Sequence, residues 1–546
     1  MRSRKIYAGP ESFHPNHPGK PVGQAEGHEL ICGSTYEPSL ISRLPEIVWS
    51  AVGLGFAWSD FGFLCGPTGA RNYLSEVTLT QRLAKKERVA VHMEIKISEL
   101  TEQRFNALAA HSRSPAAAYV SKELGWYTNE DESVIGVLLL DTVDDDFAAV
   151  AMARDENRAY RAIDVESSIK SKDEALEWLR GAMKWLTGTD KKVFPQGGPN
   201  QGVDLFSPIV HISKQHPYFI RLANEESFLS ARRIINEMMP HFADIDGNFV
   251  EQFQSSGFDS RLWELYINSY LVEEQLFINR TKHAPDFMVT KYGKTVGIEA
   301  VIVGRKKEAP SLLFREPPQP KTPENIKKEC ENPMPLRFGS ALFSKLQKKY
   351  WELPHVAGNP LAIAIADFHD DQSMLWSSSA LESYLYGVRH EYHYEDGNLV
   401  IDPITIEKHT KPDGTEIPSG YFFQPNAEHI SAVLFSASGT ISKFNRLGRQ
   451  AGFGSPSVKM FRVGTCYDCD PNASTPKIFK YEVTEDSRET WGEGMSMFHN
   501  PNAVNPVPEE LFPSIAHHRL EKDQIVSKIP EFHPFSSQTL NLRMTK

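Results

Sequence analysis

Apolar residues in the first half of the chain come in short runs broken by polar turns. Three such runs, residues 134–140, 147–153 and 160–165, are separated by turns rich in Asp, Thr and Asn, which predicts an antiparallel meander of strands. Ser171 then begins a Ser-Lys-Asp-Glu capping box, and apolar residues follow it at helical spacing. We therefore expect a small α+β unit here, followed by a glycine-rich loop at residues 194–202.

The second half alternates helical patterns with short apolar runs. Its first two strands are joined by a Tyr-Gly-Lys turn, whereas the later strands need helical crossovers, so we predict an α/β layer within a mixed α+β chain. A proline-rich insertion, residues 310–335, separates the second strand from the next helix. Helices are expected at residues 224–239, 260–275, 340–351, 377–386 and 440–451, and strands at 287–290, 296–303, 361–368 and 430–437.

Length and composition are typical of a multi-domain globular protein. The 546 residues exceed one ordinary core, and 40% of them are apolar. Five cysteines are too few for a disulfide framework, which indicates a reducing compartment, and a cytoplasmic protein is expected. The basic N-terminus is followed by Pro, His and Gly, so we expect no signal peptide. Segment 47–64 contains Asp60 and several glycines, so we expect a buried helix or strand pair and no membrane partner.

Charge is distributed unevenly along the chain. The net charge of −11 argues against a protein that binds nucleic acid over its whole surface. Residues 280–349, however, contain 15 Lys and Arg against 7 Asp and Glu, whereas residues 122–190 contain 8 against 16. A basic segment within an acidic chain indicates a confined site for a polyanion, although solvated helix faces would give the same count.

Three acidic residues occupy positions that suggest chemistry. Glu264 falls on the helix expected at 260–275, and Asp286 follows Pro285 at the start of a strand. Glu299 lies inside an apolar strand, where a carboxylate is costly to bury unless it is paired or binds a metal ion. Pairing of the two strands as a hairpin would bring Asp286 near Glu299, at a spacing suited to Mg²⁺.

The Pro285-Asp286 pair, twelve intervening residues and Glu299 at the centre of the second strand resemble the motif of the PD-(D/E)xK nuclease superfamily. The resemblance covers about residues 255–450 and implies an αβββαβ core. In that family two acids and a backbone carbonyl hold Mg²⁺ or Mn²⁺, a water attacks the phosphodiester, and a lysine stabilises the developing charge. By this resemblance Asp286, Glu299 and Glu264 are catalytic acids that bind the metal together with the carbonyl of Ala300. Glu264 matches the additional acid that many members carry on the preceding helix.

With this core in place, the chain divides into four parts. Residues 1–200 are expected to form an N-terminal α+β domain of unknown role, and residues 201–255 a helical connector. The nuclease-like core would occupy residues 256–455, and residues 456–546 would be a C-terminal extension that packs on it.

The motif lysine is displaced in this sequence. Val301 stands two residues after Glu299, where the family pattern has lysine. Some members supply the lysine from the neighbouring helix, and the helix expected at 340–351 offers Lys345, Lys348 and Lys349. Lys345 borders the apolar stripe of that helix, so we expect it to point toward the acids and to be catalytic. Lys349 and Lys348 remain alternatives.

These features predict a Mg²⁺-dependent endonuclease that acts on DNA, and the resemblance suggests a role in bacterial restriction or phage defence. The expected partners are nucleic acid and either a second copy of the chain or another defence protein. The alternative is a catalytically inactive protein of this fold that binds nucleic acid or serves as a scaffold. Cations of the basic segment are expected to contact the substrate, namely Arg305, Lys306, Lys307, Lys348 and Lys349.

A single CxxC pair, Cys466 and Cys469, is the other chemical signal. A zinc site needs four ligands, and no second CxxC or HxxxH pair follows nearby, so two free thiols are the alternative to a zinc site. The sequence contains no GxSxG elbow and no GxGxxG after a strand, which gives no support to a serine hydrolase or to a dinucleotide-binding fold.

Overall fold

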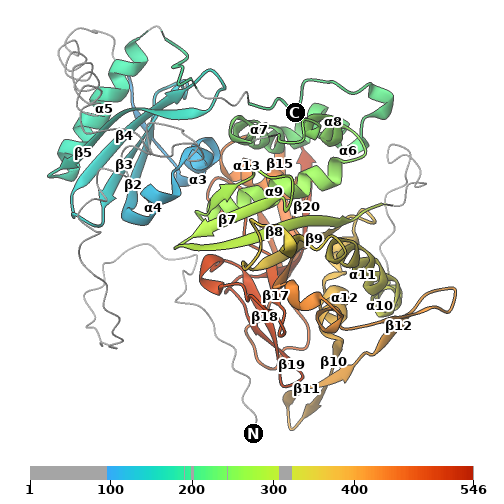
Figure 1. The fold of residues 1–546 in the computed structure, drawn as a ribbon. Helices are drawn as coiled ribbons and strands as arrows, with labels where there is room; N and C mark the ends of the chain where they lie inside the picture. Colours follow the sequence, from blue (N-terminus) through green and yellow to red (C-terminus); the bar gives the residue numbers. More distant parts are fainter. Residues whose placement is uncertain (1–94, 190, 198–201, 243, 306–321, 545–546) are drawn as a thin grey trace.

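The computed structural model describes residues 95–189, 191–197, 202–242, 244–305 and 322–544, which form a mixed α/β structure with several sheets (Figure 1). The segment 47–64, residues 198–201 of the expected loop, and both Lys306 and Lys307 lie outside this range. Among the described residues, no helix combines the length and apolar character needed to cross a membrane.

The expected meander is confirmed, and it belongs to a five-stranded antiparallel sheet in the order β1-β2-β3-β4-β5. Two further strands precede it, β1 being only three residues long and β2 mixing polar residues with a glycine, so neither has a clear alternating pattern. Helix α5 covers one face, and the Ser171 hydroxyl accepts the backbone N–H of Glu174 at its N-terminus (3.3 Å). The elements are β1 (Ser98–Leu100), β2 (Ser121–Thr128), β3 (Val134–Asp141), β4 (Phe147–Arg154), β5 (Tyr160–Ile169) and α5 (Lys172–Gly188).

A layer of helices lies between this sheet and the rest of the molecule (Figure 1). The helix expected over 224–239 is present but begins later: α6 ends at Asn224, a 3₁₀ turn follows at Glu226–Phe228, and α7 begins at Leu229. Glu225, the residue that follows α6, forms an ion pair with Arg221 of that helix. The layer contains α3 (Glu102–Ala109), α7 (Leu229–Met238) and α9 (Phe258–Glu273). Of the other helices in this part of the chain, α4 (Pro115–Val120) packs against β2, α6 (Pro217–Asn224) against α7, and α8 (Phe249–Gln254) against α9.

The second large sheet has eight strands in the order β19-β18-β17-β14-β9-β8-β7-β6. Strands β8, β9 and β14 run parallel, and β6, β7 and β8 form an antiparallel meander. Residues 495–528 contribute three of the strands. The bounds are β6 (Phe277–Asn279), β7 (Phe287–Lys291), β8 (Lys294–Val303), β9 (Leu361–Asp367), β14 (Ala432–Ser436), β17 (Met495–His499), β18 (Ala516–Glu521) and β19 (Gln524–Lys528).

The hairpin of β7 and β8 fixes the register that matters for the acids. Tyr292 and Gly293 both adopt positive φ (53° and 71°), as a two-residue type I′ turn requires. Phe287 consequently pairs with Ile298, which places Asp286 and Glu299 at the next position along the two chains.

Helices cover both faces of this sheet. Helix α9 packs on one face of β8, and α11 (Pro333–Leu346) packs on the other together with α12 (Ser378–Tyr386). The bounds 340–351 expected for helix α11 were wrong. Helix α11 begins at Pro333 and α10 (Pro323–Glu331) precedes it, so the end of the proline-rich segment is helical, with prolines in first turns. The helix ends at Leu346, and Lys349 adopts a left-handed φ of 52°.

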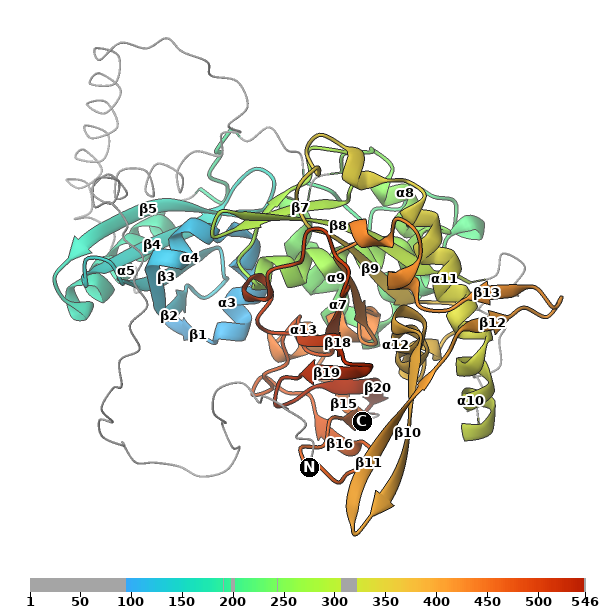
Figure 2. The same ribbon diagram turned by 60° about the horizontal axis from the view of Figure 1, so that its bottom comes forward.

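The C-terminal part adds a three-stranded sheet and a projecting hairpin. In Figure 2 the hairpin of β10 and β11 extends away from the body of the molecule. The three-stranded sheet has the order β16-β15-β20. The bounds are β10 (Val388–Glu395), β11 (Asn398–Thr405), β12 (Lys408–Thr410), β13 (Glu416–Pro418), α13 (Ile441–Gln450), β15 (Val458–Cys466), β16 (Lys477–Glu482) and β20 (Pro534–Arg543).

A fully buried carboxylate, Glu489, joins α13 to the three-stranded sheet. Arg446 donates to both of its oxygens (2.7 and 2.8 Å), Lys443 lies at 2.9 Å, and Arg462 at 3.5 Å. Burial alone would raise the pKa of Glu489, but the three cations outweigh it and hold the pKa well below its usual range. The ionised carboxylate therefore compensates the buried charges of Lys443 and Arg446 and shares that of Arg462 with Glu493.

Glu489→Gln should destabilise the protein by about 3–5 kcal/mol at pH 7, because it leaves buried cations without their counter-charge. Urea denaturation followed by circular dichroism measures this. Glu482→Gln, at a solvent-accessible ion pair with Lys459, is the control and should change stability by less than about 0.5 kcal/mol. Equal stability of the two variants would contradict a compensating role for Glu489.

Candidate functional site

Asp286 and Glu299 are held side by side by the hairpin. The backbone N–H of Asp286 donates to Oε2 of Glu299 (3.2 Å), and the backbone N–H of Ala300 donates to Oδ2 of Asp286 (2.7 Å). Each carboxylate thus binds the backbone of the other strand. Glu299 is 4% exposed, so its charge is removed from solvent.

Two side chains from the α11 region bind Glu299. Lys345 Nζ donates to its Oε1 at 2.5 Å, and the hydroxyl of Tyr350 donates to the same oxygen at 2.9 Å. Leu342 and Leu346 are buried on either side of Lys345 in sequence and seat the helix against the sheet. The lysine stem can then run along apolar surface while its ammonium reaches the acid.

Glu264 approaches the same region from α9, but its charge is already compensated. Arg261 binds both of its oxygens (2.7 and 3.0 Å), and Arg280 Nη2 lies 3.6 Å from Oε2. Burial raises the pKa of Glu264, while Arg261 and Arg280 oppose this rise. The guanidinium of Arg280 also stacks over Phe287, 4.9 Å from the ring centre, so it is held against the first residue of β7.

Asp286 is the least compensated acid of the three. Burial, followed by repulsion from Glu299 and Glu264, raises the pKa of Asp286 to about 7, against the opposing effects of the Ala300 N–H and Lys345. A cation placed between Asp286 and Glu299 would relieve this repulsion.

The donor set fits a hard divalent cation. Mg²⁺ and Mn²⁺ prefer oxygen ligands, and the two carboxylates supply them from adjacent positions. Within the described residues, Oδ1 of Asp286 accepts no hydrogen bond, so it remains for such an ion. Arg261 and Arg280 bind Glu264 instead, which makes it a weaker candidate ligand than the other two acids.

The other residues expected at the site are arranged differently. Arg305 pairs with Asp259 (3.1 Å) and Asp371 (2.5 Å), so its charge is compensated within the protein. Lys348 and Lys349 lie beyond the end of α11 and are exposed, which corrects their placement on that helix. Lys349 is paired with Glu352 at 3.5 Å.

Cys466 is buried and Cys469 is exposed. Within the described part of the chain, neither cysteine belongs to a group of three or more side chains that could hold a metal ion.

Sequence reasoning missed three residues that bind the acids. Arg261 could have been found, because a residue three positions before Glu264 lies on the same helix face. Tyr350 could also have been found, because it follows the apolar Leu346 by four residues on the helix expected at 340–351, and a tyrosine hydroxyl beside apolar side chains usually needs a partner. Arg280 had no local signal, since it reaches Glu264 only through the tertiary fold.

A cavity of about 1550 Å³ lies elsewhere, between the five-stranded sheet and helices α3, α7 and α9. Its walls include Trp126, Val150 and Tyr160 from the sheet and Glu273 from α9. The candidate residues Glu264, Asp286, Glu299 and Lys345 do not line it, so it is separate from the acidic site.

Asp286→Asn should stabilise the metal-free protein by at least about 1.4 kcal/mol at pH 8, which is the free energy of a shift of one pKa unit. Because the folded state raises the pKa of Asp286 to about 7, stability is lost as the pH rises from about 4 toward 7, and the variant escapes this loss. The gain should vanish below about pH 4. Chemical denaturation in chelator at pH 4, 6 and 8 tests this, with the exposed Asp145→Asn as the control. A gain that is independent of pH would exclude the repulsion.

Similarity to known proteins assigns no function to the chain. Searches against models of protein families, curated proteins and solved structures found no significant match. A function therefore has to be inferred from the chemistry of the chain's own residues.

Proposed function

We propose that this protein is a Mg²⁺- or Mn²⁺-dependent nuclease of the PD-(D/E)xK type that hydrolyses phosphodiester bonds of DNA. The observation that carries the proposal is the contact of Lys345 with Glu299, which is hydrogen-bonded to Asp286. A lysine far away in sequence supplies the charge that Val301 cannot. The chain order α9, β6, β7, β8, α11, β9 is compatible with an αβββαβ core.

Asp286, Glu299 and, by resemblance, the carbonyl of Ala300 would hold the cation. When bound, the ion would polarise the phosphodiester and lower the pKa of the attacking water. Tyr350 keeps the Glu299 carboxylate oriented, because it donates to the same oxygen as Lys345. Glu264, held by Arg261 and Arg280, would contribute less to binding the cation, because these two arginines compensate its charge.

Lys345 is proposed to stabilise the phosphate in the transition state, where negative charge grows on its oxygens. Its present partner, Glu299, is also a proposed metal ligand, so the ammonium already lies beside the ion position. A fixed positive charge at that place acts on the reacting group without reorganisation of the chain.

Substrate contacts are proposed for the basic segment 280–349. Lys348 and Lys349 are exposed a short distance beyond Lys345 in sequence, where a phosphate backbone could reach them. Arg305 is a poorer candidate, because Asp259 and Asp371 compensate its charge. Restriction or phage defence remains the proposed setting, and an inactive scaffold of the same fold remains the alternative.

Glu299→Gln and Asp286→Asn should each lower DNA cleavage by roughly 100-fold or more, because each removes a charged ligand of the ion. Supercoiled plasmid and single-stranded DNA are incubated with the protein in Mg²⁺, Mn²⁺ or chelator, and products are resolved on gels. Glu352→Gln, from the exposed pair with Lys349, is the matched control and should cleave like wild type. If the wild type binds DNA but never cleaves it, the scaffold alternative is favoured.

Lys345→Ala should reduce kcat by about 10²–10³-fold and change KM little, because the interaction strengthens mainly in the transition state. Lys345→Arg should restore activity only partly, since a planar guanidinium does not replace a compact ammonium. Lys349→Ala is the control and should retain kcat. A Lys345→Ala variant that raises KM alone would show that this lysine only binds substrate.

A further inference from the structure

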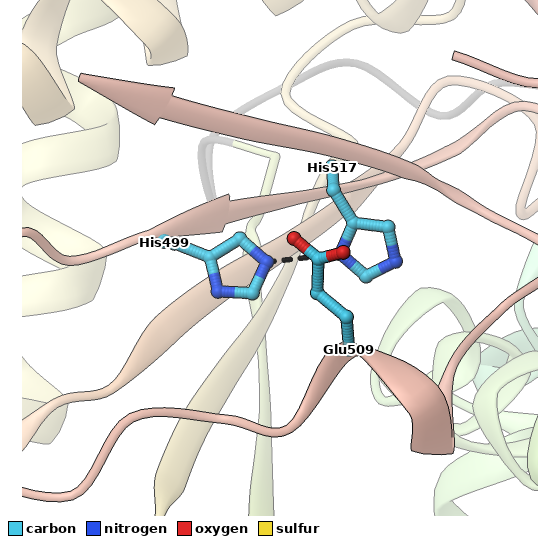
Figure 3. Close-up of side chains that lie close together, drawn as sticks. All are labelled: His499, Glu509 and His517. Atoms are coloured by element: carbon cyan, nitrogen blue, oxygen red, sulfur yellow. Dashed lines mark hydrogen bonds between the residues drawn. The ribbon is translucent and has the colours of Figure 1, made fainter. Parts of the chain in front are cut away.

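A second cluster, of two histidines and one glutamate, lies at strands β17 and β18 of the eight-stranded sheet. His499 ends β17 and His517 lies in β18, the strand parallel to it, while Glu509 is in the 3₁₀ turn Glu509–Leu511 between them. His499 and His517 are 3% and 2% exposed. One ligand atom of each residue lies within 4.8 Å of the other two, and Figure 3 shows the carboxylate beside both rings.

The hydrogen bonds orient the two imidazole rings toward one point. Nε2 of His517 lies 2.9 Å from the carbonyl oxygen of Phe512, which can only accept, so this nitrogen carries the proton. Nδ1 of His517 therefore presents a lone pair, and it faces Nε2 of His499 at 2.9 Å (Figure 3). A backbone carbonyl that fixes the tautomer of a histidine is the usual outer partner of a metal-ligating imidazole.

Glu509 supplies a carboxylate whose two oxygens differ in their contacts with neighbouring cations. Both contacts from Arg519, from Nε at 2.9 Å and Nη2 at 2.6 Å, go to Oε1. Lys528 lies 3.6 Å from Oε2, beyond hydrogen-bonding distance. Oε2 is thus the oxygen that a cation could share, while Arg519 keeps the carboxylate in place.

We propose that His499, His517 and Glu509 form a binding site for a transition-metal ion, with Zn²⁺ as the representative ion. Two imidazole nitrogens and one carboxylate oxygen are a common zinc donor set, and a water would complete four-coordination. Coordination at about 2.0–2.1 Å requires the two rings to separate by a few tenths of an ångström, and the proton of His499 to reside on Nδ1. No proton has to leave the protein.

This site differs from the acidic site in place and in chemistry. Strands β14 and β9 separate β17 from β8, so three strand spacings of about 4.8 Å lie between the two. Imidazole nitrogens select softer ions than the oxygens of Asp286 and Glu299 do. Because its ligands come from two strands and the turn between them, the ion would tie segment 500–515 to the sheet and stabilise the folded chain.

The full-length protein, dialysed against chelator and then against Zn²⁺, should retain one zinc per chain by elemental analysis and should show a higher Tm than the chelated form. The measurement is made in Asp286→Asn, so that the acidic site does not contribute. His499→Gln, His517→Gln and Glu509→Gln should each weaken zinc binding at least about 10-fold in competition with a chromophoric chelator. Co²⁺ in place of Zn²⁺ should give the visible absorption of a four-coordinate site.

Two controls separate this site from others. His518→Gln removes a neighbouring buried histidine that binds Ser496 and Ser527 instead, and Cys469→Ser removes an exposed thiol; both should retain zinc. Glu509 is partly exposed, so Glu509→Gln decides the question if a histidine variant fails to fold. Absence of bound zinc, equal zinc affinity in the three ligand variants, or loss of zinc in Cys469→Ser would overturn the proposal.

Discussion

Helix α9 is enclosed on every side, and the arrangement of the other elements depends on that burial. Twelve of its sixteen residues are buried, so it has almost no solvent face. The indole N–H of Trp263 donates to the carbonyl of Ala364 in β9 (3.0 Å), and the hydroxyl of Tyr266 donates to the carbonyl of Trp491 (2.8 Å). A helix that is apolar on nearly all sides is stable only when other elements pack against every face of it. One hydrophobic core accordingly runs from the five-stranded sheet, through the helices, to β8.

This burial also determines the electrostatics of the acidic site. Three carboxylates are placed close together in a region that excludes water, where unpaired charges are costly. Glu264 is compensated by two arginines, and Glu299 by Lys345 and the Tyr350 hydroxyl. Among the described residues, Asp286 accepts a backbone N–H but has no cation at contact distance, so burial and repulsion from Glu299 and Glu264 raise its pKa to about 7. The uncompensated charge is therefore concentrated on one residue beside the position where a divalent cation would bind.

The sheet offers two different chemical environments at well-separated places. Oxygen donors gather where β7 and β8 pair, and imidazole donors gather where β17 and β18 run parallel. In both places a backbone group fixes the orientation of one donor: the Ala300 N–H for Asp286 and the Phe512 carbonyl for His517. Strand pairing fixes the geometry of each donor set locally, so the two sets are positioned independently of one another.

The sequence by itself determined those features that depend on local patterns. The meander 134–165, the capping box at Ser171 and the β7–β8 hairpin follow from alternation, capping and turn chemistry, which act over a few residues. The choice of Lys345 as the lysine nearest the acids came from helical periodicity, although the helix itself begins and ends earlier than its apolar stripe suggested. Short β6 and the Arg280–Glu264 pair left no periodic signal. Only the tertiary structure decided which polar groups bind one another, because Arg280, Tyr350 and the His499–His517 pair meet their partners between separate helices and strands, beyond the reach of local patterns.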